Sequence, residues 1–82
     1  MPLVIAPVGK ELKIIKVLAQ TGIKKHLENL GIIAGGKITI ISICDGSVIC
    51  LVKDGRIALD KGVATKIFVQ EEAWWNYLAN SQ

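Results

Sequence analysis

Histidine, cysteine and aromatic residues are scarce in this chain of 82 residues. It contains one histidine and two cysteines, and only four residues are Trp, Tyr or Phe. A lone His26 excludes a histidine dyad and a multi-histidine metal site within one chain, although His26 could contribute one ligand to a metal site that another chain completes. The small number of cysteines and the lack of a signal peptide favour a reducing, cytoplasmic compartment.

Long hydrophobic runs are also absent. No stretch approaches the ~20 apolar residues that a membrane-spanning helix requires, so we expect that the chain does not itself cross a membrane. Yet 51% of the residues are hydrophobic and the mean hydropathy is +0.47. Because a domain of this size buries only ~60–65% of its surface, we expect the surplus apolar surface to be covered by a homo-oligomer or another partner.

Positive charge is not concentrated in any one segment. The net charge is +3, and the lysines are spread along the whole chain. Binding of nucleic acid requires basic and stacking aromatic residues on one face, so no nucleic-acid partner is expected. A nucleic-acid-binding barrel is kept only as an alternative function.

A catalytic constellation is missing as well. The acidic residues are dispersed, and none of them forms a spaced general acid and base pair. Neither Ser42 nor Ser47 lies in a G-x-S-x-G context. Segment 31–37 is rich in glycine, but it leads into a strand, whereas a phosphate-binding P-loop leads into a helix. We therefore predict that the protein is not an enzyme.

One segment around His26 and Gly31 combines three signals for a helix and its end. Ile23, Leu27 and Leu30 lie at i, i+4 and i+7, which places them on one helical face. Gly31 follows where a helix C-terminus favours a residue at positive φ, and Ile32 is placed for the hydrophobic contact of a Schellman motif back onto Leu27. The sequence predicts a helix over residues 22–30.

The start of this helix is marked by Thr21, a suitable N-cap residue. Lys24 and Lys25 then lie in the first turn, where positive charge opposes the helix dipole. Two interpretations stay open for them: a solvated helix face, or a basic patch that faces an acidic partner.

Short apolar runs predict strands before and after the helix. In residues 11–17 the apolar alternation changes phase at Ile15, which indicates a bulge. Two Asp-Gly pairs, at Gly46 and Gly55, predict type I′ turns that join three strands into a meander. The first nine residues are expected to be an extended lead-in and residues 61–65 a single turn, for which 3₁₀ is one interpretation. The meander strands span 37–44, 47–53 and 56–59, and the closing strand spans 66–69.

Both faces of the predicted meander carry apolar residues, which indicates that its second face is covered too. We expect Ile38, Ile40 and Ile49 on one face and Ile41, Ile43 and Val48 on the other.

The two cysteines of the meander can be placed by the same pairing. In a two-residue turn, Cys44 pairs with Ser47 and Cys50 pairs with Ile41, so the thiols point to opposite faces and cannot form a disulfide. We interpret both as small apolar fillers.

Taken together, the elements predict a mainly β fold, a small, partly open SH3-like barrel of about five strands with one short helix after the first strand. It occupies residues 1–70. Residues 71–82 form a tail of different composition that we expect to be helical. Trp74, Trp75 and Leu78 share one apolar face of it, which either packs on the open end of the barrel or anchors a partner.

Several short motifs resemble the FeoA family of ferrous iron transport. They are the string His26-Leu27-Glu28-Asn29-Leu30-Gly31-Ile32 followed by Gly35, the end of the meander Arg56-Ile57-Ala58-Leu59-Asp60, and Gly62-Val63-Ala64-Thr65-Lys66-Ile67 near the last strand. Their order and spacing carry the resemblance, which covers about residues 2–70. The tail extends past the usual end of the family.

The resemblance implies an SH3-like barrel that serves as an accessory or regulatory binding module in bacterial ferrous iron uptake. It implies a cytoplasmic partner surface on the FeoB-type permease with its GTPase domain, at the inner face of the membrane. The family is also associated with transition metals, so ferrous iron is a candidate ligand. We expect the apolar outer face of the meander or the Trp-containing tail to dock on the partner, with Lys24 and Lys25 complementing its charge.

Overall fold

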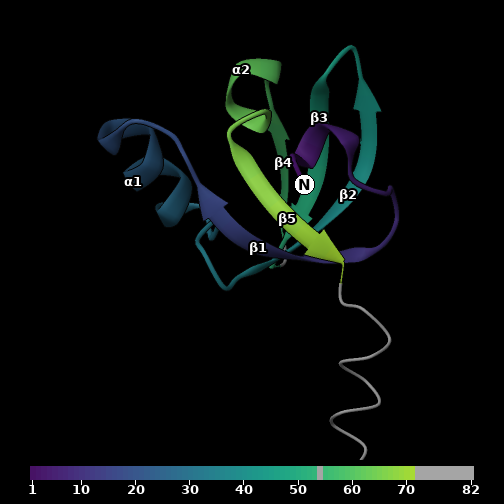
Figure 1. Ribbon diagram of the computed structural model, residues 1–82, viewed down its shortest axis with the longest axis horizontal. Coiled ribbons are helices and arrows are strands. Elements are labelled where there is room, and N and C mark those ends of the chain that lie inside the picture. The colour runs from purple at the N-terminus through teal and green to yellow at the C-terminus, as the bar shows by residue number, and fades with distance from the viewer. Residues whose placement is uncertain (54, 72–82) are drawn as a thin grey trace, which may run out of the picture.

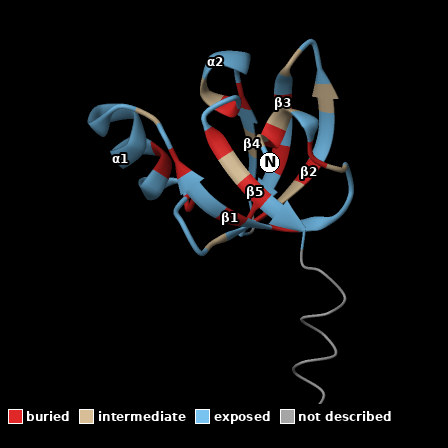
Figure 2. Cartoon of the chain, in the orientation of Figure 1, coloured by how far each residue is buried: buried red, intermediate tan, exposed pale blue. Residues whose placement is uncertain are grey.

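The computed structural model describes residues 1–53 and 55–71. Within them, five antiparallel strands form one curled sheet in the order β4-β3-β2-β1-β5 (Figure 1). The predicted mainly β fold of about five strands is therefore confirmed, and the sheet curls around an interior of Ile, Val and Leu side chains (Figure 2). The predicted tail helix over 72–82 lies outside the described residues. The strands are β1 (Glu11–Val17), β2 (Lys37–Cys44), β3 (Ser47–Val52), β4 (Gly55–Leu59) and β5 (Ile67–Glu71).

The predicted bulge in β1 is confirmed. The register between β1 and β5 shifts between Ile14 and Lys16, so Ile14 and Val17 both point into the core while Ile15 is 45% exposed. One extra residue in a strand reverses its inside–outside alternation, and the resulting bend lets β1 pair with β2 at one end and with β5 along its length.

A second bulge, in β2, was not predicted and corrects two expectations. The register shifts between Ile40 and Ser42, so Cys50 pairs with Ile40 and not with Ile41. The same shift turns Val48 into the core and leaves Ile49 42% exposed, which is the reverse of the predicted faces. Ile43, expected on the outer face, packs against the core. An alternation pattern alone cannot show where a bulge reverses it.

The first hairpin turn is confirmed and the second is shifted. Asp45 and Gly46 both have positive φ, 51° and 83°, as a type I′ turn requires. In the second hairpin Val52 pairs with Gly55, so Gly55 belongs to β4 and not to the turn. The turn contains Lys53, at φ 55°, one residue earlier than the sequence predicts.

The first residues are not simply extended. Leu3–Ile5 form a short 3₁₀ helix, η1, and Leu3 is completely buried. Met1 holds this segment against β5, because its α-ammonium group donates to Val69 O and Val69 N–H donates to Met1 O, each at 2.8 Å. Leu3 therefore fills the core where the curled sheet would otherwise be open.

Helix α1 (Thr21–Asn29) begins one residue earlier than predicted. Its N-cap is Gln20, in extended conformation and without a side-chain cap, so the expected Thr21 cap is wrong. Its C-terminus is the predicted Schellman motif: Gly31 has φ 95°, Ile32 N–H donates to Leu27 O at 2.8 Å, and Gly31 N–H donates to Glu28 O at 3.0 Å.

Only one side chain of the predicted apolar face of α1 reaches the core. Leu27 is buried, while Ile23 and Leu30 are 43% and 37% exposed. The helix stands to one side of the sheet and is mostly exposed (Figures 1 and 2). Much of its predicted inner face is therefore accessible surface.

The single turn after β4 is α-helical rather than 3₁₀. Helix α2 spans Lys61–Ala64, and the carboxylate of Asp60 caps it by accepting a hydrogen bond from Val63 N–H at 2.9 Å. Within the part of the chain that the structure describes, no helix has the length and apolar character to cross a membrane.

Candidate functional site

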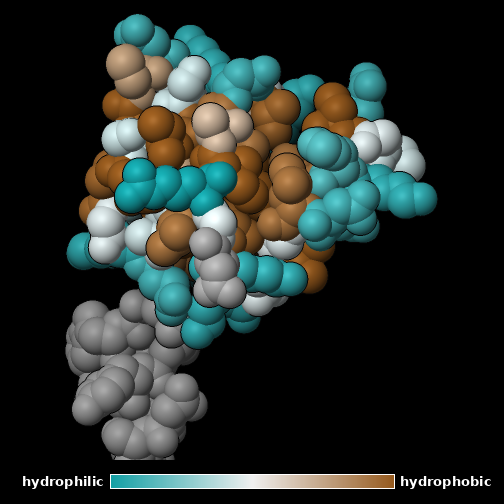
Figure 3. All heavy atoms as spheres, turned by 180° about the vertical axis from the view of Figure 1, so that it is seen from behind, coloured by the Kyte–Doolittle hydropathy of each residue, from teal (hydrophilic) through white to brown (hydrophobic). Residues whose placement is uncertain are grey.

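Two apolar surfaces on the barrel are candidates for binding. The first is the outer face of the meander, where Ile41, Ile49 and Leu51 are 37–42% exposed. Seen from the side opposite to Figure 1, hydrophobic side chains cover much of the middle of the molecule (Figure 3). Apolar side chains grouped in this way mark interaction surfaces more often than isolated ones do.

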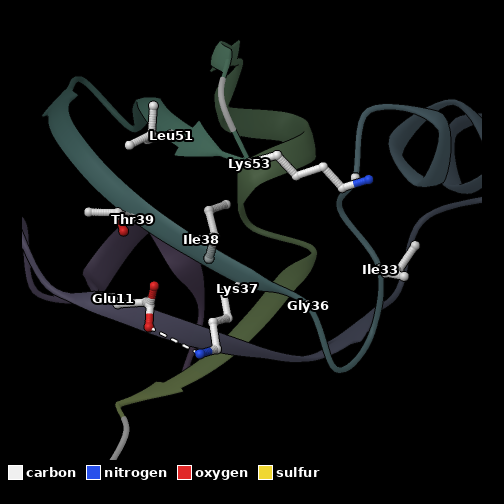
Figure 4. A pocket seen from close by; sticks show the side chains of 9 residues that line it. Glu11, Ile33, Gly36, Lys37, Ile38, Thr39, Leu51 and Lys53 are labelled. Atoms are coloured by element: carbon white, nitrogen blue, oxygen red, sulfur yellow. Dashed lines mark ion pairs between the residues drawn. The ribbon is translucent and has the colours of Figure 1, made fainter.

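A groove runs beside this outer face; we call it the outer groove. It has a volume of about 340 Å³ and lies across β1, β2 and β3 and the loop after Gly31 (Figure 4). Thr39 pairs with Glu11 on one side and with Leu51 on the other, so one row across three strands forms its wall. Lys37 Nζ lies 3.4 Å from Glu11 Oε1 within it.

Lys53 forms the side of the outer groove nearest to α1. Its side chain extends toward Ile33 (Figure 4) and passes over Gly31, where an added Cβ would lie 3.3 Å from Lys53 Cε. The outer groove thus combines apolar side chains, chiefly Ile33 and Leu51, with two ammonium groups from Lys37 and Lys53.

The second surface is the space between α1 and the end of β1; we call it the helix cleft. Its volume is about 610 Å³, larger than that of the outer groove. Leu18 and Ile33, 57% and 46% exposed, contribute apolar surface to it. Two cations, Lys16 and Lys24, and one carboxylate, Glu28, also line it.

Lys16 is oriented by an aromatic ring. Its ammonium lies 5.1 Å from the centre of the Phe68 ring, within the range of a cation–π interaction. This contact orients the charge of Lys16, so the helix cleft presents apolar surface next to the ammonium groups of Lys16 and Lys24.

Of the predicted partner-binding residues, Lys24 lines the helix cleft, and Lys25 is exposed on the same helix. Trp74, Trp75 and Leu78 lie outside the described residues. The contribution of each to binding stays a prediction. Leu18, Ile33 and Leu51 were not identified from the sequence as binding residues. For Leu18 and Ile33 the sequence does contain a signal, because each is an apolar residue in a segment predicted to be a loop.

His26, the candidate metal ligand, is exposed on α1. Among residues 1–53 and 55–71, no three His, Cys, Asp or Glu side chains are grouped so that they could hold a metal ion. The role of His26 therefore stays a prediction that involves a second chain or a partner.

The two cysteines are chemically different. Cys44 is exposed, whereas Cys50 is buried and its thiol donates to Ile57 O at 3.5 Å. Burial raises the pKa of the Cys50 thiol to about 11, because the interior disfavours the thiolate. Both are free thiols, and the predicted absence of a disulfide between them agrees with this geometry.

One further predicted structural glycine, Gly35, lies in the loop after Gly31 that contributes to both surfaces. Gly35 has φ 88°, and its N–H donates to Ile14 O at 2.7 Å, which fixes the loop between the outer groove and the helix cleft against β1. Only a residue that tolerates positive φ holds this loop without strain.

Comparison with known proteins identifies a family over nearly the whole described chain. The family model of the FeoA domain matches residues 1–71. A Methanocaldococcus jannaschii protein that carries the name Fe(2+) transport protein A is 36% identical over 70 residues, which is 85% of each of the two chains.

Solved structures of FeoA proteins share the fold. The solution structure of FeoA from Chlorobium tepidum matches with a TM-score of 0.79 at 19% identity, over 89% of this chain and 71% of that one. FeoA from Stenotrophomonas maltophilia, solved in complex with zinc and described as a prokaryotic SH3 domain protein, matches with a TM-score of 0.72 at 21% identity, over 85% and 89% of the two chains. The SH3-like fold predicted from the sequence is thus confirmed.

Proposed function

The chain belongs to the FeoA family, and from that premise we propose that it is a non-enzymatic accessory protein of ferrous iron uptake. It acts in the cytoplasm by binding the cytoplasmic side of a FeoB-type permease. Two relatives support this role: one is named for Fe(2+) transport, and the Stenotrophomonas protein is described as a candidate activating factor of ferrous iron transport.

The helix cleft is the observation that carries the proposal. It is larger than the outer groove, and the side chains of Leu18 and Ile33 in its lining are exposed. A partner segment would complement the helix cleft if an apolar residue packed against Leu18 and Ile33 and a carboxylate paired with Lys16 or Lys24.

The chemistry of this cleft is that of a binding surface. Its lining provides two ammonium groups and one carboxylate among aliphatic side chains, and neither a hydroxyl nor an imidazole that could act as nucleophile or base. Regulation of the partner through contact, rather than a reaction of its own, fits these residues.

Ferrous iron is the cargo of the permease on this proposal. Direct binding of the ion would require His26 together with ligands from a second chain or from the partner. A cobalt(II) titration that leaves the imidazole signals of His26 unchanged would contradict such a shared site without affecting the docking proposal.

Retention by the permease tests the proposed function. The immobilised chain is incubated with the soluble GTPase domain and with the full-length permease of the same organism, with and without guanine nucleotide. We expect retention of both, and about tenfold weaker binding by Leu18→Glu, which places a carboxylate in the helix cleft and removes ~1.4 kcal/mol of binding free energy.

Leu51→Glu is the matched control, because Leu51 is also an exposed leucine but lies on the outer groove. A loss confined to Leu51→Glu would place the docking surface on the outer face of the meander. No retention in any nucleotide state would contradict the proposed function itself.

A further inference from the structure

The last described residue lies beside the outer groove. Glu71 ends β5, pairs with Leu12, and forms an ion pair with Lys10 at 3.1 Å. Glu11, which lies between Lys10 and Leu12 in the sequence, lines the outer groove. Residues 72–82 therefore begin one strand away from this groove.

The other two hollows are at the far end of the same strands. The helix cleft is lined by Val17 and Leu18, and a third hollow, of about 310 Å³, by Lys66 and Val63. Val17 pairs with Ile67 at the opposite end of β5 from Glu71, four residues or about 13 Å away at ~3.3 Å per residue. Position thus favours the outer groove among the three.

The length of chain also fits. Thr39 lies on β2, two strand spacings from β5, or about 10 Å across the sheet. Trp74 is three positions beyond Glu71, and three extended residues span at most about 10–11 Å. The first indole of the segment can therefore reach the Thr39 end of the row formed by Thr39 and Leu51.

The composition of the segment complements the groove. All 10 Lys and Arg residues of the chain lie between positions 10 and 66, whereas residues 72–82 contain Glu72, Trp74, Trp75 and Tyr77 and no basic residue. The groove offers Leu51 and Ile33 for apolar contact and Lys37 and Lys53 as cations. An indole can contact the apolar side chains through its hydrophobic surface and the ammonium groups through its π face.

We propose that the outer groove is the binding site of the chain's own C-terminal segment, with the indole of Trp74 or Trp75 seated between Thr39, Leu51 and the side chain of Lys53. This interaction covers Leu51 in the isolated protein and leaves the helix cleft free. It is independent of iron uptake, so its test needs no permease.

Tryptophan fluorescence tests this proposal, because both tryptophans of the chain are in the segment. We expect the full chain to emit at shorter wavelength than a synthetic peptide of residues 71–82 and to be less accessible to acrylamide. Leu51→Glu should shift the emission and the quenching constant to those of the peptide. Leu18→Glu, the corresponding change on the helix cleft, should leave both unchanged.

Thr39→Glu provides a second variant on the opposite side of the groove, and far-UV circular dichroism checks that each variant is folded. Emission of the wild-type chain equal to that of the peptide would overturn the proposal. So would emission that is unaffected by both Leu51→Glu and Thr39→Glu. Emission that shifts to longer wavelength on dilution would show that the segment binds a second copy, which overturns binding within one chain.

Discussion

At the scale of single residues, burial decides the reactivity of the two thiols. Cys44 is exposed beside the first hairpin turn, whereas Cys50 is buried and its pKa is raised to about 11. The thiolate is the reactive form, so a raised pKa suppresses reaction near neutral pH. The same residue type thus gives one modifiable and one inert group, six positions apart.

We predict that a disulfide exchange reagent at pH 8 labels one thiol per folded chain, at Cys44, and two per chain in denaturant. Cys44→Ser should abolish labelling of the folded protein. Rapid labelling of Cys50 in the native state would mean that β3 opens or that this side chain is not buried.

The raised pKa of Cys50 also fixes the sign of its effect on stability. The folded state keeps the proton of the Cys50 thiol up to a higher pH than the unfolded state does. The contribution of Cys50 to the free energy of unfolding is therefore fully present below the ordinary thiol pKa and is lost as the pH rises toward about 11. In urea titrations, Cys50→Ala should therefore show a weaker decline of stability between about pH 9 and 11 than the parent chain does.

At the scale of elements, the end of α1 depends on the backbone of Gly31. Its φ is 95°, and an added Cβ would lie 3.0 Å from Val52 Cγ1. We predict that Gly31→Ala lowers the free energy of unfolding by about 1–3 kcal/mol, because a residue with a side chain is strained at this φ.

Gly22→Ala is the matched control for Gly31, since Gly22 lies inside α1 with nothing within 4 Å of an added Cβ. It should raise the stability by about 0.5–1 kcal/mol through helix propensity. Urea unfolding of the two variants measures both effects. An equal response of both would mean that the Schellman motif does not hold α1 in solution.

Local signals predicted the elements better than their registers. Gly31 and the Asp45-Gly46 turn were identified because each requires a backbone conformation that few residues adopt. The bulge in β2 has no such signal: Ile40, Ile41 and Ile43 are equally apolar, and only the fit to β3 decides which of them points inward. Register is a property of the pair of strands, so one strand's sequence does not reveal it.

The candidate site was harder to predict than the fold for a related reason. Leu18, Ile33 and Leu51 come from three separate segments and meet at two surfaces only after β1 bends and α1 turns away from the sheet. Lys24 was identified because its charge conflicts with the helix dipole, a signal contained in the helix itself.

At the scale of the whole molecule, the helix cleft and the outer groove lie at opposite ends of β1. Leu18 follows the last residue of β1, while Leu51 lies in the row that contains Glu11, the first residue of β1. Ile33 lines both hollows, so the loop after Gly31 is the one wall that they share.

We predict that Leu18→Glu and Leu51→Glu act independently. Substitutions more than ~7–10 Å apart without shared partners usually add within about 0.5 kcal/mol, and these two are separated by nearly the length of β1. The double variant should lose permease retention and tryptophan protection together, with an unfolding free energy that equals the sum of the single effects. A larger deviation in urea unfolding would indicate coupling through the loop at Ile33.

The reciprocal hydrogen bonds between Met1 and Val69 have a consequence for synthesis on the ribosome. The hairpins β2–β3 and β3–β4 connect neighbouring segments, so they can pair as soon as they emerge. Leu3 and the inner face of β1 have no β5 to cover them until residues 67–71 have left the exit tunnel. Until β5 emerges, the nascent chain therefore carries uncovered apolar surface at Leu3 and on the inner face of β1, the kind of exposure that promotes aggregation.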